Sequence, residues 1–246
     1  MVGMKLRILI VGILGIACLS VADPEPKPLD AREVFLSFAD SFYDCVKDEK
    51  ISYKALQYGL KGYHHLKSNA KLKKKTHLTI VDFSLPSSEE RMFVIDVEKN
   101  EVVHKSLVAH GTETGDLQAS TFSNEHDSHM SSLGFYITGR VYRGKHEESI
   151  KLHGLERGFN DNAYDRGVVI HRADYCDRDF LESNSNVLGR SYGCPAVPFN
   201  EYDKLLNIVR DGSCFFIYYP DKDYLRKSRM VNSTKGYENF LESYGK

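Results

Sequence analysis

One cysteine lies in a turn-forming segment whose residue types suit nucleophilic chemistry. Cys194 stands between Gly193 and Pro195. Glycine permits positive φ and close approach by a substrate, while proline fixes the direction in which the chain leaves the turn. Such a turn exposes the thiol and directs backbone N–H groups at one point: its own amide and that of Gly193 or Tyr192. The pattern predicts Cys194 as the nucleophile of an acyl transfer.

A cysteine attacks as the thiolate, so it needs a neighbour that accepts its proton. Histidine is the usual residue for this role near neutral pH. Of the ten histidines, His171 is distinguished by its context, because it directly ends the apolar run Val168-Val169-Ile170. The end of a strand holds a side chain rigidly at the edge of a site. We therefore predict His171 as the general base, with a purely structural histidine as the alternative.

These residues together resemble a known enzyme family. Val169-Ile170-His171 followed by Ser191-Tyr192-Gly193-Cys194 is similar to the L,D-transpeptidases, the YkuD-type cysteine enzymes of peptidoglycan. The best match is the exported branch with a Gly-Arg-Ser-x-Gly-Cys-Pro-Ala run, here residues 189–196. Further segments agree with that branch in the same order, namely 79–84, 108–111, 122–124, 131–134, 152–156 and 160–163. The resemblance covers roughly residues 76–220.

The resemblance implies a fold and a reaction. The fold would be mainly β with flanking helices, a YkuD-like β-sandwich with a small helical N-terminal extension and no cofactor. The thiolate would attack the third residue of a peptidoglycan tetrapeptide stem and expel the terminal D-alanine. An amine of another stem would then take the acyl group, giving a 3-3 cross-link. Water as acceptor gives an L,D-carboxypeptidase, and a lysine acceptor would tether a protein. The acceptor stays open, because Tyr192 stands where many members have histidine.

The resemblance also assigns residues that contact the substrate. Ser191 would shape the site, and Arg190 would meet a substrate carboxylate through a bidentate contact. His110 and Asn124 would line the donor site, although a strand-ending turn and a merely polar loop explain them equally well. Arg172 stands where this branch more often has glycine. It either adds a cation beside the thiolate or stacks on a neighbouring segment.

N-terminal helices followed along the sequence by strands are expected to position these residues. Asp30 and Glu33 resemble a capping box for a first amphipathic helix, and a second is expected from Ser52. From Thr76 onward the hydrophobic period changes to two, which predicts strands. The expected strands are 78–83, 91–97, 102–109, 135–138, 149–155, 167–173 and 213–219, with a helix over 199–210. The predicted units are a signal peptide (1–22), a proline-rich leader with a helical extension (23–75), a catalytic domain (76–222) and a polar tail (223–246).

The first residues resemble an export signal. Lys5 and Arg7 precede an apolar stretch over 8–19 and a small-residue site that ends at Ala22. About a dozen apolar residues are too few for a comfortable membrane span, which needs roughly 20. We therefore predict cleavage after Ala22 and a periplasmic or cell-envelope protein without a stable membrane span. The alternatives are an uncleaved anchor and a lipoprotein attached through Cys18.

Composition narrows the remaining classes. A net charge of -1 and 41% hydrophobic residues describe a globular protein and give no electrostatic case for nucleic acid. The histidines at 126, 129, 146 and 153, with Asp174, suggest a zinc hydrolase as a rival, but the spacings typical of zinc peptidases are missing. A non-catalytic peptidoglycan-binding protein is the second alternative. Four cysteines would follow the signal, and Cys45, Cys176 and Cys214 could form disulfides in an oxidising compartment. The sequence does not determine an oligomeric state.

Overall fold

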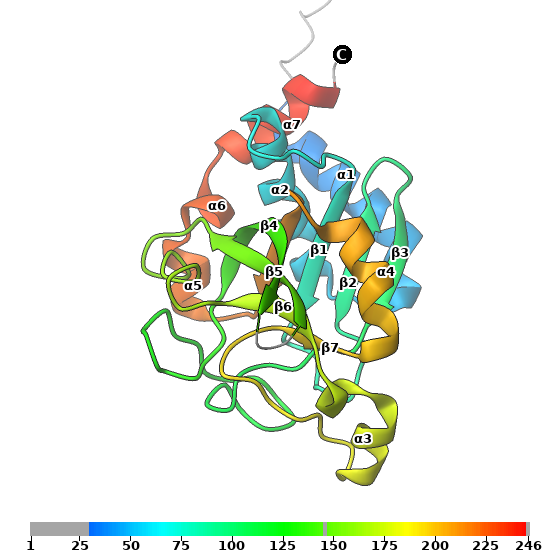
Figure 1. Ribbon diagram of the computed structural model, residues 1–246. Coiled ribbons are helices and arrows are strands. Elements are labelled where there is room, and N and C mark those ends of the chain that lie inside the picture. Colours follow the sequence, from blue (N-terminus) through cyan, green and yellow to red (C-terminus); the bar gives the residue numbers. More distant parts are fainter. Residues whose placement is uncertain (1–29, 145–146, 245–246) are drawn as a thin grey trace, which may run out of the picture.

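The protein is built on one curled β-sheet (Figure 1). A computed structural model describes residues 30–144 and 147–244, and Asp48 by its backbone alone. The predicted signal peptide and Cys18 lie outside these residues. Within them, eight strands pair in the order β3-β2-β1-β8-β4-β5-β6-β7. The strands are β1 (His77–Asp82), β2 (Met92–Asp96), β3 (Glu101–Ser106), β4 (Gly134–Gly144), β5 (Glu147–Gly154), β6 (Val169–Arg172), β7 (Ala196–Val197) and β8 (Cys214–Tyr218).

The two edges of this sheet approach each other. The pairs β1–β8 and β6–β7 are parallel, and the other neighbours are antiparallel. Beyond β3 the chain continues to Ala109, which forms an antiparallel bridge with Ala196 of β7. The Ala109 N–H donates to the Ala196 carbonyl at 2.8 Å. The sheet is therefore nearly closed, and the prediction of a mainly β protein with flanking helices is confirmed.

Helices cover both faces of the sheet and one end. α1 (Ala31–Val46) begins where the Asp30 carboxylate accepts a hydrogen bond from the Arg32 amide at 2.8 Å. Ser52 caps α2 (Tyr53–Ser68) through the Ala55 amide at 3.2 Å. The remaining helices are η1 (Lys47–Glu49), η2 (Asp174–Cys176), α3 (Arg178–Ser183), α4 (Phe199–Val209), α5 (Lys222–Lys227), α6 (Arg229–Asn232) and α7 (Lys235–Tyr244). No helix of the described chain is long and apolar enough to span a bilayer.

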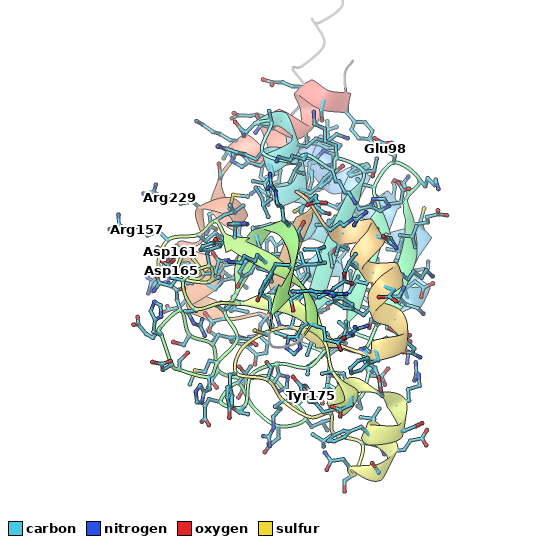
Figure 2. All side chains as sticks on the ribbon, viewed as in Figure 1. Glu98, Arg157, Asp161, Asp165, Tyr175 and Arg229 are labelled. Atoms are coloured by element: carbon cyan, nitrogen blue, oxygen red, sulfur yellow. The ribbon has the colours of Figure 1, made fainter. Side chains whose placement is uncertain are left out.

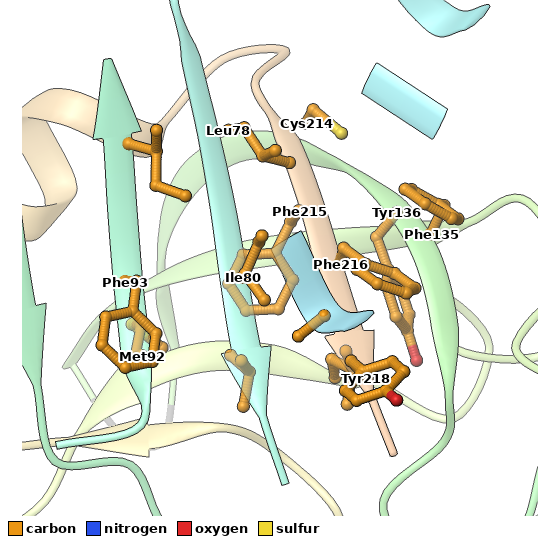
Figure 3. Close-up of a cluster of buried hydrophobic side chains, with 14 of the residues drawn as sticks. Leu78, Ile80, Met92, Phe93, Phe135, Tyr136, Cys214, Phe215, Phe216 and Tyr218 are labelled. Carbon is orange, nitrogen blue, oxygen red and sulfur yellow. The ribbon is translucent and has the colours of Figure 1, made fainter. Parts of the chain in front are cut away.

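The core is formed where α2 crosses the central strands. Large apolar side chains of β1, β8 and β4 are buried in one cluster, and consecutive residues such as Phe215 and Phe216 of β8 are both enclosed (Figure 3). Gly62 allows the close approach of the helix, because a Cβ at this position would lie 2.2 Å from the Phe135 ring. Phe135 in turn stacks on Phe216, with ring centroids 4.1 Å apart. These contacts fix the central strands, from which β5, β6 and β7 extend toward one edge.

Long loops gather at the end of the sheet opposite to α1 and α7. Figure 1 shows α1, α2 and α7 near the C-terminus, while α3 and several connections lie at the other end. These connections include residues 107–133 between β3 and β4, 155–168 between β5 and β6, and 184–195 before β7. The predicted nucleophile and most of the predicted substrate-binding residues belong to these segments.

Candidate active site

Cys194 lies against the beginning of β6, the strand that carries His171. In the parallel ladder His171 pairs with Ala196, and the His171 N–H donates to the Pro195 carbonyl at 3.3 Å. The Cys194 Sγ is 3.8 Å from the Gly167 carbonyl and accepts a hydrogen bond from the Val169 amide. The thiol is partly exposed, and the His171 imidazole is buried. His171 therefore lies on β6, and Cys194 lies two residues before the adjacent strand β7.

The turn before Cys194 is held by hydrogen bonds of Ser191. Its hydroxyl donates to the Cys194 carbonyl at 2.6 Å and accepts from the Gly193 amide at 3.1 Å. Gly193 has φ +112°, and a Cβ there would lie 2.5 Å from the Met130 carbonyl oxygen, so only glycine fits without displacement. Ser191 is nearly buried, with 7% of its surface exposed. It therefore shapes the turn from inside.

The amides around this turn differ in their hydrogen bonds. The N–H of Gly193, a predicted oxyanion donor, is already bonded to Ser191. In the part of the chain that the structure describes, the amides of Tyr192 and Cys194 have no hydrogen-bond acceptor. Tyr192 is 72% exposed and stacks on His129, with ring centroids 4.3 Å apart. The amides of Tyr192 and Cys194, more than that of Gly193, are therefore available to an incoming oxygen.

The surroundings of His171 fix its tautomer. Its Nδ1 lies 3.0 Å from the carbonyl oxygen of Arg172. A carbonyl oxygen only accepts hydrogen bonds, so Nδ1 carries the proton in the neutral ring. The basic nitrogen of neutral His171 is then Nε2, as a general base of this kind requires.

The charge near Cys194 comes from Arg166, which the sequence patterns did not predict. Burial raises the pKa of the Cys194 thiol, and the Val169 amide and the Arg166 guanidinium act in the opposite direction. Arg166 lies in the 155–168 loop and is half-buried. Nothing in its local sequence marks it, because its position beside the thiol depends on how the loop before β6 folds back.

The two predicted substrate-binding arginines have other partners. Arg172 forms an ion pair with Glu147, and its guanidinium lies 5.1 Å from the centre of the Phe199 ring. Stacking, the second of the two alternatives for Arg172, is therefore what the structure contains. Arg190 forms an ion pair with Asp116 at the surface. Contact of Arg190 with a substrate carboxylate therefore stays a prediction.

His110 lies in the interior, with both ring nitrogens in hydrogen bonds. Its Nδ1 is 2.7 Å from Nη2 of the buried Arg91, and its Nε2 is 3.0 Å from the Gly115 carbonyl. Burial and the Arg91 charge lower the pKa of His110 to about 4. The ring is thus neutral and internally bonded, so the structural alternative fits His110 and a solvent-facing role does not.

Asn124 joins two of the loops near the site. Its side-chain amide donates to Asp161 at 2.7 Å and accepts from the Asn162 amide at 3.1 Å. It lines a groove of about 520 Å³ between the 120–133 loop and the chain after β8. Contact with a peptide remains a prediction for this residue, and its loop-joining bonds are what the structure contains.

Two further expectations concern cysteines and metals. Cys45, Cys176, Cys194 and Cys214 are all free thiols. Burial raises the pKa of Cys176 and Cys214 strongly, so these thiols are unreactive. Within residues 30–144 and 147–244, no three His, Cys, Asp or Glu side chains are grouped to hold a metal ion.

Comparison with known proteins identifies the family. The model of the L,D-transpeptidase catalytic domain matches residues 47–218, which is more than half of the chain. The chain therefore belongs to the L,D-transpeptidase catalytic domain family, and the predicted resemblance is confirmed. The matched region includes α2 as well as the whole sheet. A search of curated proteins found no match.

Solved structures give weaker similarities. An L,D-transpeptidase from Mycobacterium smegmatis is 11% identical over 58% of this chain and 59% of its own, with a TM-score of 0.38. The helical cell shape determining protein Pgp2 from Campylobacter jejuni, in a mutant form, is 14% identical over 67% and 57%, with a TM-score of 0.38. An L,D-transpeptidase from Xylanimonas cellulosilytica is 13% identical over 57% and 59%, with a TM-score of 0.33. This chain thus covers less than two thirds of each of those chains.

Proposed function

We propose that this protein is a peptidoglycan L,D-transpeptidase that acts on tetrapeptide stems through a Cys194 thioester, releases D-alanine and forms 3-3 cross-links. The observation that supports the proposal most directly is the adjacency of Cys194 and the His171 strand inside the segment that matches the family. The amides of Tyr192 and Cys194 next to the thiol add suitable oxyanion donors.

The proposed acylation uses His171 as base and then as acid. Nε2 of His171 takes the Cys194 thiol proton, and the thiolate attacks the carbonyl carbon of the third stem residue. The negative charge moves to the carbonyl oxygen and is stabilised by the backbone amides. The oxyanion then collapses, the bond to the terminal D-alanine breaks, and His171 returns the proton to the leaving amine. The products are free D-alanine and a thioester on Cys194.

The second half of the reaction regenerates the thiol. An acceptor amine attacks the thioester carbonyl and gives its proton to His171, which transfers it to the departing Cys194 sulfur. A second stem as acceptor gives the 3-3 cross-link. Water as acceptor gives a tripeptide, which is the L,D-carboxypeptidase alternative. Both candidates share the acyl-enzyme, so they differ only in the second step.

The decisive experiment follows the acyl-enzyme by mass spectrometry. The purified protein is incubated with tetrapeptide muropeptides or with a carbapenem, and the adduct is located by peptide mapping. We expect an adduct on Cys194 that is absent from Cys194→Ser, with released D-alanine and dimeric products only from proteins that keep Cys194. Cys45→Ser is the matched control, because Cys45 is an exposed thiol on α1, outside the matched region.

The products distinguish the candidate functions. Dimers with a 3-3 link support transpeptidation, and tripeptides alone support carboxypeptidation. Stoichiometric binding without an adduct would replace the enzymatic proposal by the non-catalytic peptidoglycan-binding alternative. Full turnover by Cys194→Ser would contradict the assignment of the nucleophile.

We also propose that the protein is exported. The support is the predicted signal at residues 1–22, which lies outside the described residues, and membership of a family of cell-wall enzymes. The N-terminal sequence of the mature protein tests this point. A start at Asp23 supports cleavage after Ala22, and a lipid-modified start at Cys18 supports the lipoprotein alternative.

A further inference from the structure

Arg166 forms several hydrogen bonds with residues 123–132, the loop that faces the cysteine turn. Its Nη1 donates to the Ser123 carbonyl at 2.9 Å, and its Nη2 donates to the Met130 carbonyl at 2.7 Å. Longer contacts reach the hydroxyls of Ser128 at 3.3 Å and Ser132 at 3.4 Å. The planar fork of a guanidinium can hold several acceptors at fixed angles, which an ammonium group cannot do. One side chain thus fixes the path of residues 123–132.

This loop touches the residue directly before the nucleophile. The Ser131 hydroxyl donates to the Gly193 carbonyl at 3.2 Å. Nη2 of Arg166 would lie 3.2 Å from a Cβ at Gly193, beside the Met130 carbonyl at 2.5 Å. The guanidinium therefore packs against the backbone of the cysteine turn itself, with the thiol on the next residue.

The positive charge of Arg166 has no direct ionic partner. Arg172 and Arg190 form ion pairs with Glu147 and Asp116, whereas no carboxylate of the described chain lies within ion-pair distance of Arg166. Its close hydrogen-bond partners are carbonyls and hydroxyls, which leave its full charge in place. A half-buried charge of this kind acts on its neighbours more strongly than an exposed one.

We propose that Arg166 is the positioning residue of this site: it holds the 123–132 loop against the Gly193 turn and places an unpaired positive charge next to the turn that carries Cys194. The inference deepens the proposed function and rests on it for the role of Cys194. Arg166 does not exchange protons in the reaction. It acts through Cys194 by favouring the thiolate and by fixing the turn that carries it.

The other titratable groups near Arg166 and Cys194 carry little compensating charge. Burial raises the pKa of Tyr175, which lies near Cys194 from η2, and of Tyr136, which lies near Arg166 from β4. Both hydroxyls are therefore neutral at physiological pH. The exposed Glu125 carboxylate acts on Arg166 from the loop. Since burial raises the pKa of Cys194, Arg166 and the Val169 amide are the groups that oppose this effect.

The test measures the ionisation of Cys194 without requiring turnover. Wild type, Arg166→Met, Arg166→Lys and Arg157→Met are alkylated with iodoacetamide between pH 5 and about 10, and each cysteine is quantified by peptide mass spectrometry. Arg157 is an exposed arginine of the same loop, and Figure 2 shows it at the periphery, well separated from Tyr175. The exposed Cys45 thiol serves as an internal reference in every sample.

We expect Arg166→Met to shift the Cys194 profile upward by about one pH unit, which is about a tenfold slower alkylation on the acid side of the curve. Arg166→Lys keeps the positive charge but lacks the planar guanidinium, so the Cys194 alkylation profile should shift less than in Arg166→Met. Turnover of muropeptides should still fall, because the 123–132 loop is held less firmly. Arg157→Met and the Cys45 profile should not change. Ser128→Ala, which removes one acceptor and keeps the charge, should leave the Cys194 profile unchanged.

A Cys194 profile that is the same in wild type and folded Arg166→Met would overturn the proposal. If Arg166→Met does not fold, Arg166→Lys and Arg166→Gln decide the question by the same measurement, with circular dichroism as the check of folding. A shifted profile in a protein that processes no muropeptide would contradict the proposed function and leave the role of Arg166 intact. An unshifted Cys194 profile in an Arg166→Met protein that still processes muropeptides would contradict the role of Arg166 and leave the proposed function intact.

Discussion

At the scale of single residues, the cysteine turn depends on a glycine that has no substitute. Gly193 combines a left-handed backbone with contact to the Met130 carbonyl, so strain and steric overlap both oppose a side chain. Gly158 has φ +81° and no atom within 4 Å of the position of a Cβ. Substitution of Gly158 therefore tests the backbone strain alone, whereas substitution of Gly193 tests the strain together with the steric overlap.

We expect Gly193→Ala to reduce labelling of Cys194 by a carbapenem at least about tenfold, because the turn must move to admit the methyl group. Gly158→Ala should lower the free energy of unfolding by about 1 kcal/mol with labelling unchanged. Labelling kinetics and urea denaturation of both variants check this prediction. Equal labelling of Gly193→Ala and wild type would show that the turn tolerates displacement.

At the scale of elements, α7 completes a helical layer with α1 and α2. Its Phe240 is buried, with ring centroids 5.3 Å from Phe35 and 4.7 Å from Phe38 of α1. On the same helix Tyr244 contacts Phe38 but stays 57% exposed. α7 and α1 both lie outside the matched region 47–218, whereas α2 lies inside it, so the layer combines one helix of the matched domain with two flanking helices.

We predict that Phe240→Ala lowers the free energy of unfolding by about 3 kcal/mol, because it leaves a cavity among buried rings. Tyr244→Ala is the matched control on the same helix, and its cost should stay below about 1 kcal/mol. Guanidinium denaturation followed by circular dichroism measures both. Similar costs for the two variants would indicate that α7 is not packed as described.

At the scale of the whole molecule, buried histidines link stability to pH. Burial lowers the pKa of His64 from its ordinary value near 6.5 to about 3, with a smaller contribution from Lys67. Both ring nitrogens of His64 are buried without a hydrogen-bond partner in the described structure. His110 behaves similarly, with a pKa of about 4. In both cases the unfolded chain binds protons at a higher pH than the folded chain.

The sign of the effect follows from this difference. The stability contributed by a neutral buried imidazole is complete above pH 6.5 and is lost progressively as the pH falls toward the folded pKa. We expect His64→Phe to lose less stability than wild type between pH 7 and pH 4, by on the order of 2 kcal/mol. Thermal or urea unfolding at several pH values measures this difference. Parallel stability curves for the two proteins would contradict the prediction.

Local sequence patterns were enough to predict the class of the protein and the main elements of its body. The Gly-Cys-Pro turn and the strand-ending His171 carry their signal in adjacent residues, and the family match confirms the predicted resemblance. The change of hydrophobic period at Thr76 predicted the position of every longer strand of the sheet, and it predicted helix α4 close to its observed bounds. The end of β4 was wrong, because this strand continues past the predicted 135–138 to Gly144, paired with β5. These features are local, so a pattern of a few residues is enough to specify them.

The side chains that surround the thiol could be identified only from the folded chain. In the folded chain the Arg166 charge acts on the Cys194 thiol, and His110 is buried against Arg91. Arg172 and Arg190 form ion pairs with carboxylates. The fold also creates the two-residue β7, which exists only because β6 and Ala109 offer it hydrogen bonds. Contacts between distant loops depend on how the sheet closes, and no spacing along the chain encodes that closure.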